Sequence, residues 1–317
     1  MLLKSLFSDN MATILVTGGT GLVGQALTRQ LTNMGYYCIV MSRKPRPATN
    51  GIRYAVWNPD AGTMDEASLQ EADYIIHLAG AGVADQRWTA ARKKEIRDSR
   101  VKSGELLVKK LTTVPHKIRA VISASAIGWY GADPEIPNPQ PFTEEAPPDT
   151  AFLGDTCFRW EESLQPITEM PVRLVKLRIG IVLSMDGGAL REFIKPLRFG
   201  VATVLGSGKQ MVSWIHIDDL VNMFVFAITN VKAEGVYNAT APTPVSNKEL
   251  ILTLAKSRKG FYLPVPVPAF ILKIMMGEMS IEVLKSATVS SSKIQQAGFT
   301  FRYPGIREAL AKEAQYR

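Results

Sequence analysis

The chain lacks several features that would place it in a special class of protein. Its 317 residues include only two cysteines, Cys38 and Cys157, which cannot build a disulfide framework and fit a reducing compartment. No stretch approaches the roughly 18 consecutive apolar residues of a membrane-spanning helix. The opening segment MLLKSLFSDN has no small-residue cleavage site, so we expect no secretory signal and a cytoplasmic location.

Acidic residues are also fewer than basic residues. The chain has 29 Asp and Glu against 37 Lys and Arg, a formal net charge of +8. Such an excess indicates a solvated basic surface, or an anionic ligand such as a phosphorylated cofactor or a nucleic acid. The cations are spread along the chain, except in the run Arg92–Lys102, and no nucleic-acid-binding motif accompanies them. We therefore expect neither a nucleic acid nor a membrane as a partner.

Short apolar runs alternate with longer amphipathic segments in the first half of the chain, which is typical of a parallel sheet flanked by helices. The expected strands are residues 13–16, 37–41, 53–57, 74–78, 120–123 and one strand within 174–183, and the expected helices are 21–34 and 92–111. This order predicts an α/β fold, a Rossmann-type doubly wound parallel sheet, over residues 12–185. Residues 1–11 are expected to be an N-terminal extension.

A smaller substrate-binding lobe is expected at residues 186–317, with segments up to about residue 240 returning to the sheet. Loops with Gly and Pro alternate here with helices, which we place at 217–228, 247–257 and from 306 onward, and with a final strand at 299–303. LPVPVPAF, residues 263–270, is too rich in proline for an interior strand and is expected to lead into a helix. Residues 133–148, also rich in proline, are expected to be a surface excursion.

A glycine-rich segment, VTGGTGLVG at residues 16–24, follows the first predicted strand and opens the first predicted helix. It fits G-x-G-x-x-G from Gly19 and G-x-x-G-x-x-G from Gly18. Glycines permit a tight turn and a close approach to a pyrophosphate, and the helix N-terminus offers unpaired N–H groups. The predicted cofactor-binding residues here are Thr17, Gly18, Gly19, Thr20, Gly21, Leu22, Val23 and Gly24. The alternative is a glycine-rich turn without a ligand.

The second predicted strand ends in cations and has no carboxylate. In dinucleotide folds an Asp or Glu at this place selects NAD, whereas an Arg accommodates the 2′-phosphate of NADP. This chain offers Ser42, Arg43 and Lys44: a hydroxyl donor, a forked guanidinium and a point charge. We therefore predict NADP(H) as the cofactor and leave a solvated cationic loop as the alternative.

Four motifs together resemble the extended and atypical short-chain dehydrogenase/reductases: TGGTGLVG, HLAGA (77–81), SASAIGWYG (123–131) and WIHIDDL (214–220). The nearest likeness is to the epimerase-like family, named for sugar-nucleotide epimerases. Residues 187–220 and the tail VPAFILKIMMGEMS resemble it too, the tail being similar to a C-terminal domain of unknown function at about 263–312. The resemblance covers nearly everything from Ala12 onward.

The resemblance implies further cofactor contacts. It places the strand end at Leu78, Ala79 and Gly80 beside the adenosine and ribose of the cofactor. It also implies that Ser123 and Ser125, at the end of the fifth strand, lie near the nicotinamide.

The chain departs from the catalytic pattern of that superfamily, which uses Asn, Ser, Tyr and Lys. The Tyr and Lys stand one helical turn apart so that both face the same way. In TAFLGDTCFRWEES, residues 150–163, the Tyr place falls on Leu153 and the Lys place on Cys157. The Asn place falls on Ser99, and Ser125 remains.

Two residues with which sugar-nucleotide enzymes hold the nucleotide are replaced as well. Their places fall on Val212 and Ile181, which argues against sugar-nucleotide epimerase activity.

Ser125 and Tyr130 are the catalytic candidates. We expect Ser125 to polarise a substrate oxygen, and Tyr130 or a bound water to handle the proton. The alternative for Tyr130 is an aromatic that packs a loop. Arg100 either holds an acidic substrate or a cofactor phosphate, or is one more solvated cation.

Other conspicuous residues have structural interpretations. Cys157 is expected to be an inert small hydrophobe on a helix face rather than a reactive thiol. His216 is expected in a strand, with Asp218 or Asp219 capping the next helix. The tryptophans Trp88, Trp129 and Trp214 are assigned to the core.

The sequence thus predicts an NADP(H)-dependent oxidoreductase, or epimerase-like protein, that acts by hydride transfer on a small carbonyl or carbinol substrate. Two alternatives stay open: an NADP(H)-binding redox sensor or assembly factor without turnover, and a sugar-nucleotide epimerase with a non-standard site. We expect a monomer or homodimer and no metal.

Overall fold

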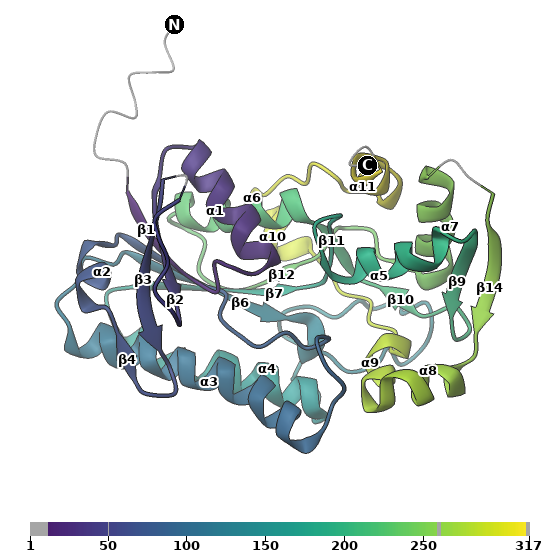
Figure 1. Cartoon of the computed structure of the whole chain (residues 1–317), viewed down its shortest axis with the longest axis horizontal. Helices are drawn as coiled ribbons and strands as arrows, with labels where there is room; N and C mark the ends of the chain where they lie inside the picture. Colours follow the sequence, from purple (N-terminus) through teal and green to yellow (C-terminus); the bar gives the residue numbers. More distant parts are fainter. Residues whose placement is uncertain (1–11, 50, 259–260, 315–317) are drawn as a thin grey trace, which may run out of the picture.

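A computed structural model describes residues 12–49, 51–258 and 261–314. It shows a large sheet with helices on both faces and a lobe beyond the ends of β6 and β7 (Figure 1). The expected N-terminal extension lies outside the described residues. No helix within the described ranges is both long and apolar enough to cross a membrane.

The central sheet has eight strands in the order β12-β7-β6-β5-β1-β2-β3-β4, and every neighbouring pair is parallel except β3 with β4. The strands are β1 (Thr13–Thr17), β2 (Tyr37–Ser42), β3 (Ile52–Asn58), β4 (Thr63–Met64), β5 (Tyr74–His77), β6 (Ala120–Ala126), β7 (Arg173–Ile179) and β12 (Gly235–Ala239). The chain reverses its direction of travel across the sheet between β1 and β5, where such folds bind their ligands.

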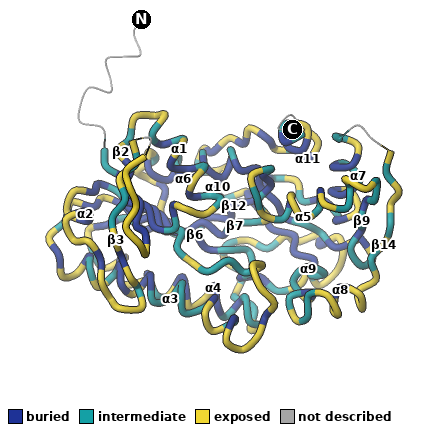
Figure 2. Tube along the Cα trace, in the orientation of Figure 1, coloured by how far each residue is buried: buried dark blue, intermediate teal, exposed yellow. Residues whose placement is uncertain are grey.

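Helices cover both faces of this sheet, which confirms the predicted doubly wound α/β class (Figure 1). One face carries α1 (Leu22–Asn33), α6 (Ile217–Thr229) and α10 (Ser292–Gln296), and the other carries α2 (Glu66–Glu71), α3 (Ala90–Thr113) and α4 (Phe152–Glu162). The short 3₁₀ helices η1 (Ile127–Trp129) and η2 (Gln165–Glu169) come directly before and after α4 in the order of elements along the chain. Central strands are buried, whereas β3 near the edge is largely exposed (Figure 2).

The smaller lobe has its own core around Leu190, Trp214 and Leu250. Its strands are β8 (Ile181–Leu183), β9 (Val201–Leu205), β10 (Met211–Val212), β11 (Trp214–His216), β13 (Val245–Ser246) and β14 (Leu263–Val267). Its helices are α5 (Gly188–Leu197), α7 (Asn247–Ser257), α8 (Ala269–Met276), η3 (Gly277–Met279), α9 (Ser280–Leu284) and α11 (Ile306–Glu313).

Gly180 divides the single strand expected within residues 174–183. β7 stays in the central sheet, while β8 leaves it and pairs with β11. A Cβ added to Gly180 would lie 2.6 Å from the carbonyl oxygen of Ser213, so only glycine lets the two segments pass this closely. At this crossing the chain leaves the central sheet and enters the smaller lobe.

The proline-rich segment at 263–270 leads into the helix α8, as predicted, and before it forms the edge strand β14, which was not predicted. The N–H of Leu263 donates to Gly200 across the pair with β9. Alternate residues point the other way, so Pro264 and Pro266 face outward and present no donors there. The free edge therefore cannot pair as an ordinary strand edge would.

The strand predicted at 299–303 is wrong. Phe299, Phe301 and Tyr303 are buried in alternation, which imitates a strand, but the segment pairs with no strand of the described chain. The Asp219 carboxylate instead accepts the N–H groups of Arg302 at 2.8 Å and Tyr303 at 2.9 Å. The Asp219 side chain on α6 thus accepts the hydrogen bonds that a neighbouring strand would otherwise accept.

The predicted cap of α6 by Asp218 or Asp219 is also wrong. His216 lies at the end of β11, as expected, and is itself the N-cap: its Nδ1 accepts the N–H of Asp218 at 3.1 Å. Both acidic residues stand in the first turn of the helix. The Asp219 carboxylate accepts the N–H groups of Arg302 and Tyr303 and therefore does not cap α6.

We predict that Asp219→Ala lowers the free energy of unfolding by about 2–4 kcal/mol, because two buried backbone N–H groups lose their acceptor. Asp218→Ala is the matched control, since its partly exposed side chain stands in the same turn, and it should cost about 1 kcal/mol or less. Urea unfolding followed by circular dichroism measures both. Equal losses in the two variants would contradict the role given to Asp219.

Candidate cofactor and substrate site

The glycine loop, residues 18–24, forms a concave stretch of backbone in which a side chain at Gly18 or Gly24 would collide with neighbouring backbone atoms. We call this loop the cradle. Gly18 has a φ of 68°, and a Cβ added there would lie 2.6 Å from the carbonyl carbon and oxygen of Leu78. A Cβ on Gly24 would lie 2.5 Å from the carbonyl oxygen of Gly18. Gly18 thus lets β1 turn sharply against the end of β5, and Gly24 lets α1 pack on the turn.

The N-terminus of α1 has N–H groups to spare. The N-cap is Gly21, no side chain caps the helix, and its first turn holds no acidic residue. These N–H groups, together with the helix dipole, suit an anion such as a diphosphate. The residues present therefore fit the pyrophosphate of a dinucleotide.

A buried histidine, which the sequence analysis did not single out, fixes the cradle to the sheet. The Thr17 hydroxyl contacts His77 Nδ1 at 2.7 Å and accepts the N–H groups of Leu78 at 3.2 Å and Ala79 at 3.3 Å. His77 Nε2 lies 3.3 Å from the hydroxyl of Ser103, which donates to the Arg100 carbonyl. All these bonds are satisfied when His77 is neutral with its proton on Nε2.

The pKa of His77 is lowered to about 3, first by complete burial and then by the charge of Arg100. The only signal of this role in the sequence was the His that opens HLAGA, at the end of a strand.

The cationic end of β2 lies open to solvent. Ser42 is buried and its hydroxyl accepts the N–H of Lys44 at 3.4 Å, whereas the side chains of Arg43 and Lys44 are exposed. Neither forms an ion pair with any residue that the structure describes. A hollow of about 460 Å³ lies between the glycine loop, α1 and β3, and its lining includes Gly19, Thr20, Gln25, Arg29, Arg46 and Tyr54.

A buried polar network lies at the carboxyl ends of β6, β7 and β12. Glu161 of α4 accepts from the Ser125 hydroxyl at 2.7 Å and from Arg178 Nε and Nη2 at 2.8 and 3.1 Å. Arg178 Nη1 donates to the Tyr130 hydroxyl at 3.1 Å, and that hydroxyl donates to Asn238 Oδ1 at 2.6 Å. A buried ion pair needs such complete hydrogen bonding, since each charge has lost its water.

This network argues against the catalytic roles expected of Ser125 and Tyr130. Ser125 lies within β6 and spends its only proton on Glu161, so it has none left to polarise a substrate oxygen. Tyr130 is fully buried, stacks on Phe142 and has a pKa raised to about 12, chiefly by burial. The packing alternative holds for Tyr130. Ser123 is buried as well, and its hydroxyl donates to the Ala124 carbonyl.

The two places on α4 that the resemblance assigns to Tyr and Lys carry apolar side chains. Leu153 and Cys157 on α4 pack against Gly128, where a Cβ would lie 3.2 Å from Leu153 Cβ and 3.5 Å from the thiol sulfur. Burial raises the pKa of Cys157 to about 12, against the opposing charge of Arg100. The thiol is therefore not a nucleophile near neutral pH.

Trp88, Trp129 and Trp214, three of the five tryptophans, lie in the core, as predicted, and the indole N–H of each donates to a backbone carbonyl. Trp88 donates to Val83, Trp129 to Ala146 and Trp214 to Thr243. Within the described ranges, no group of three or more His, Cys, Asp or Glu could hold a metal ion.

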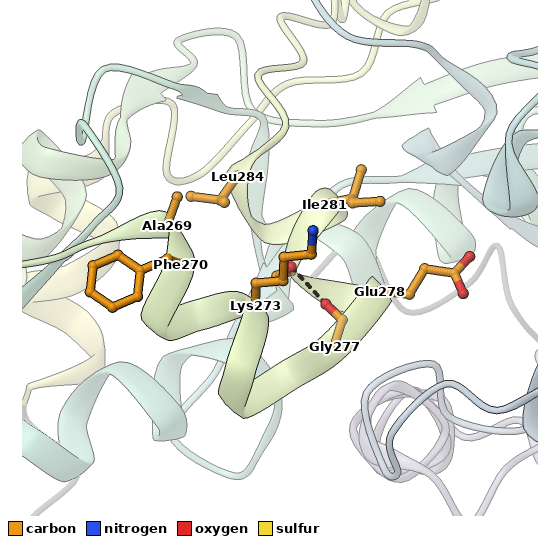
Figure 3. Close-up of a pocket in the computed structure, with 8 residues that line it drawn as sticks. Ala269, Phe270, Lys273, Gly277, Glu278, Ile281 and Leu284 are labelled. Carbon is orange, nitrogen blue, oxygen red and sulfur yellow. Dashed lines mark hydrogen bonds between the residues drawn. The ribbon is translucent and has the colours of Figure 1, made fainter.

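A second hollow, of about 280 Å³, lies between α8 and α9 in the smaller lobe (Figure 3). Its lining is mostly apolar, and its acidic residue, Glu278, is paired with Lys93 of α3 at 2.9 Å. It stands far from α1 along the long axis of the molecule (Figure 1). Nothing in its chemistry links it to the dinucleotide cradle.

Comparison with known proteins agrees with this geometry. Residues 14–153 and 183–240 match the NAD dependent epimerase/dehydratase family. The chain belongs to that family. Residues 267–313 match a domain of unknown function, DUF1731, which confirms the C-terminal domain expected at about 263–312.

Relatives extend over nearly the whole chain. Epimerase family protein YfhF of Bacillus subtilis is 35% identical, over 94% of this chain and 97% of that protein. The chloroplastic SDR39U1 homolog of Arabidopsis thaliana is 33% identical, over 98% of this chain and 89% of that protein.

Two solved structures share the fold closely. Human epimerase family protein SDR39U1, solved with NADPH, has a TM-score of 0.85 and 28% identity, covering 96% of this chain and 99% of that one. A nucleoside-diphosphate sugar epimerase from Corynebacterium glutamicum has a TM-score of 0.77 and 30% identity, covering 97% of this chain and 59% of that one.

We predict that acid destabilises this protein through His77. Its pKa of about 3 in the folded state lies below the ordinary value of 6.5, so stability from this group is complete above pH 6.5 and is lost as the pH falls toward 3. Between pH 7 and pH 5 the loss is about 2 kcal/mol. In His77→Gln this part of the acid loss should disappear.

Urea unfolding at several pH values measures the effect. Above about pH 7.5 histidine is neutral in both states, so the variant and the unaltered protein should there follow parallel curves. An equally steep loss of stability below pH 6.5 in His77→Gln would show that His77 is not the group responsible.

Proposed function

We propose that this protein is an NADP(H)-dependent oxidoreductase that transfers a hydride to or from a carbonyl or carbinol carbon. The observation that carries the proposal is the pair Arg43 and Lys44, exposed and without ion pairs among the described residues, beside a glycine cradle that fits a dinucleotide. A third phosphate gives these two cations a partner. The NADPH bound to human SDR39U1 supports the same choice.

The cofactor supplies the hydride, and the residues of the chain position it. The N–H groups at the start of α1 would hold the diphosphate, Arg43 and Lys44 would hold the 2′-phosphate with Ser42 at their base, and the backbone of Leu78–Gly80 would line the adenosine and ribose. Ser123 and Ser125 close the end of β6, where their bonds to Ala124 and Glu161 keep the floor of the site rigid. Because neither Ser125 nor Tyr130 has a proton to spare, a bound water handles the substrate proton.

A second candidate function is binding of NADP(H) without turnover, as in a redox sensor or assembly factor. The apolar pair Leu153 and Cys157 favours it, since neither side chain can act as acid or base near neutral pH. The two functions share the cofactor and differ in whether the reduced nicotinamide is consumed.

Absorbance of the reduced nicotinamide band distinguishes them. We expect a panel of small aldehydes, ketones and keto acids, supplied with NADPH, to contain at least one compound that lowers this absorbance catalytically. A panel of nucleotide sugars, analysed for product stereochemistry, tests epimerase activity in parallel. Tight NADPH binding with no consumption in either panel would favour the sensor.

Charge reversal tests the cofactor assignment. We predict that Arg43→Glu/Lys44→Glu weakens NADPH binding by about 10- to 100-fold, because charge-assisted hydrogen bonds of about 1.5–3 kcal/mol are lost. NADH binding should change by no more than about twofold, as NADH lacks the phosphate. Calorimetry measures both, and Lys109→Glu/Lys209→Glu, at two exposed cations away from β2, is the control with the same net charge. Equal affinity of the unaltered protein for NADPH and NADH would refute the assignment.

A further inference from the structure

Arg100 on α3 is a largely enclosed cation next to the proposed cofactor path. Its guanidinium lies over the ring of Trp160, 5.0 Å from the ring centroid, and beside Gly80, where a Cβ would stand 3.0 Å from Arg100 Cζ. Burial lowers the pKa of Arg100, which nevertheless stays charged because guanidinium is so strong a base. A charge held in such a place calls for a counter-charge.

No carboxylate that the structure describes forms an ion pair with Arg100. On α3 it shares this with Lys109, whose side chain is exposed to solvent. Six other cations of α3 each pair with an acidic residue: Arg92 with Glu95, Lys93 with Glu278, Lys94 and Arg97 with Asp98, Lys102 with Asp60 and Lys110 with Glu66. Those pairs explain most of the basic run as solvated and neutralised surface. They do not explain Arg100.

The guanidinium is held by one nitrogen, which leaves a whole edge for a ligand. Nη1 donates to the carbonyls of Ala81 at 3.0 Å and Ile96 at 2.8 Å. Nε and Nη2 have no hydrogen-bond partner among the described residues, and together they form the fork that matches two oxygens of a carboxylate or phosphate. With Trp160 behind it and Nη1 fixed, the fork loses little entropy when it binds.

Arg100 lies against the strand end where the dinucleotide is proposed to pass: a Cβ on Gly80 would stand 3.0, 3.1 and 3.2 Å from Arg100 Cζ, Cγ and Nη1. Gly80 is exposed, and it directly follows Leu78 and Ala79, whose N–H groups are fixed to Thr17 of the cradle. Ser99 accepts the N–H of Ala81 at 2.9 Å and so holds this turn against α3. An anion bound by Arg100 would therefore lie between the cradle and the polar floor at the end of β6.

We propose that Arg100 binds an oxyanion group of the substrate, a carboxylate or a phosphate, and so selects anionic carbonyl compounds. This inference rests on the proposed function, because the phosphates of the cofactor already have partners in the start of α1 and in the Arg43–Lys44 pair. Arg100 is therefore not needed to hold a phosphate of the cofactor. Gly80 contributes by leaving room for the guanidinium, since a Cβ there would stand 3.0 Å from Arg100 Cζ.

The unaltered protein provides the first test. NADPH is titrated first, and this titration by itself decides whether the cofactor part of the proposed function stands. The protein saturated with NADP⁺ is then titrated with oxamate and inorganic phosphate as anionic probes, and with oxamide as the neutral analogue of oxamate. We expect one of the anions to bind at least about tenfold more tightly than oxamide. Equal binding of both anions and oxamide would overturn the role of Arg100.

Variants locate the effect. Arg100→Gln should weaken binding of the anionic probe by about tenfold or more, and Arg100→Lys, which keeps the charge and loses the fork, should weaken it less. Arg97→Gln on the same helix is the matched control and should bind as the unaltered protein does. NADPH affinity should stay within about twofold in all three. If Arg100→Gln instead weakens NADPH binding and spares the anion, Arg100 serves the cofactor and the proposal fails.

Thermal unfolding of each variant shows whether its fold is intact. The comparison of oxamate with oxamide on the unaltered protein needs no substitution, so it decides the question even when Arg100→Gln does not fold.

Discussion

The site depends on the contact between two turns that leaves no room for a side chain. Gly18 at the end of β1 touches the carbonyl of Leu78 at the end of β5, and Gly24 brings α1 down onto the same turn. The Thr17 hydroxyl, oriented by His77, holds the two strand ends together. Because this chain of bonds is buried and made by neutral groups, the cradle stays rigid without a charge of its own. Its binding capacity comes from backbone N–H groups.

Charge is distributed around this neutral cradle in a consistent way. Most cations of α3 are paired with carboxylates, and the buried Arg178 is paired with Glu161. Three cations without a carboxylate partner among the described residues, Arg43, Lys44 and Arg100, lie after β2 and beside the end of β5, next to the proposed dinucleotide path. Most of the residues behind the net charge of +8 are thus ordinary surface cations. The cations to which we assign a function occupy a few positions that the fold brings near the cradle.

Sequence patterns succeeded where a local rule decides the structure. The glycine loop, the exclusion of residues 263–270 from the sheet interior and the helix Asn247–Ser257 were each predictable because turn chemistry or helical periodicity acts over a few residues. The segment 299–303 had the alternation of a strand and failed, because its N–H groups find an acceptor on Asp219, more than 80 residues earlier in the chain. Tyr130 was expected to handle a substrate proton, but its side chain is fully buried. Its partners Arg178 and Asn238 come from other strands.

The sequence by itself determined the fold class, the dinucleotide cradle and the cationic end of β2, since each follows from residue type and near neighbours along the chain. The tertiary structure decided which polar groups are available for chemistry. It commits Ser125 and Tyr130 to a buried network around Glu161, buries the thiol of Cys157, and leaves one edge of Arg100 free. Hydrogen-bond partners distant in sequence set these outcomes, because a buried polar group must be satisfied by whatever the fold places beside it.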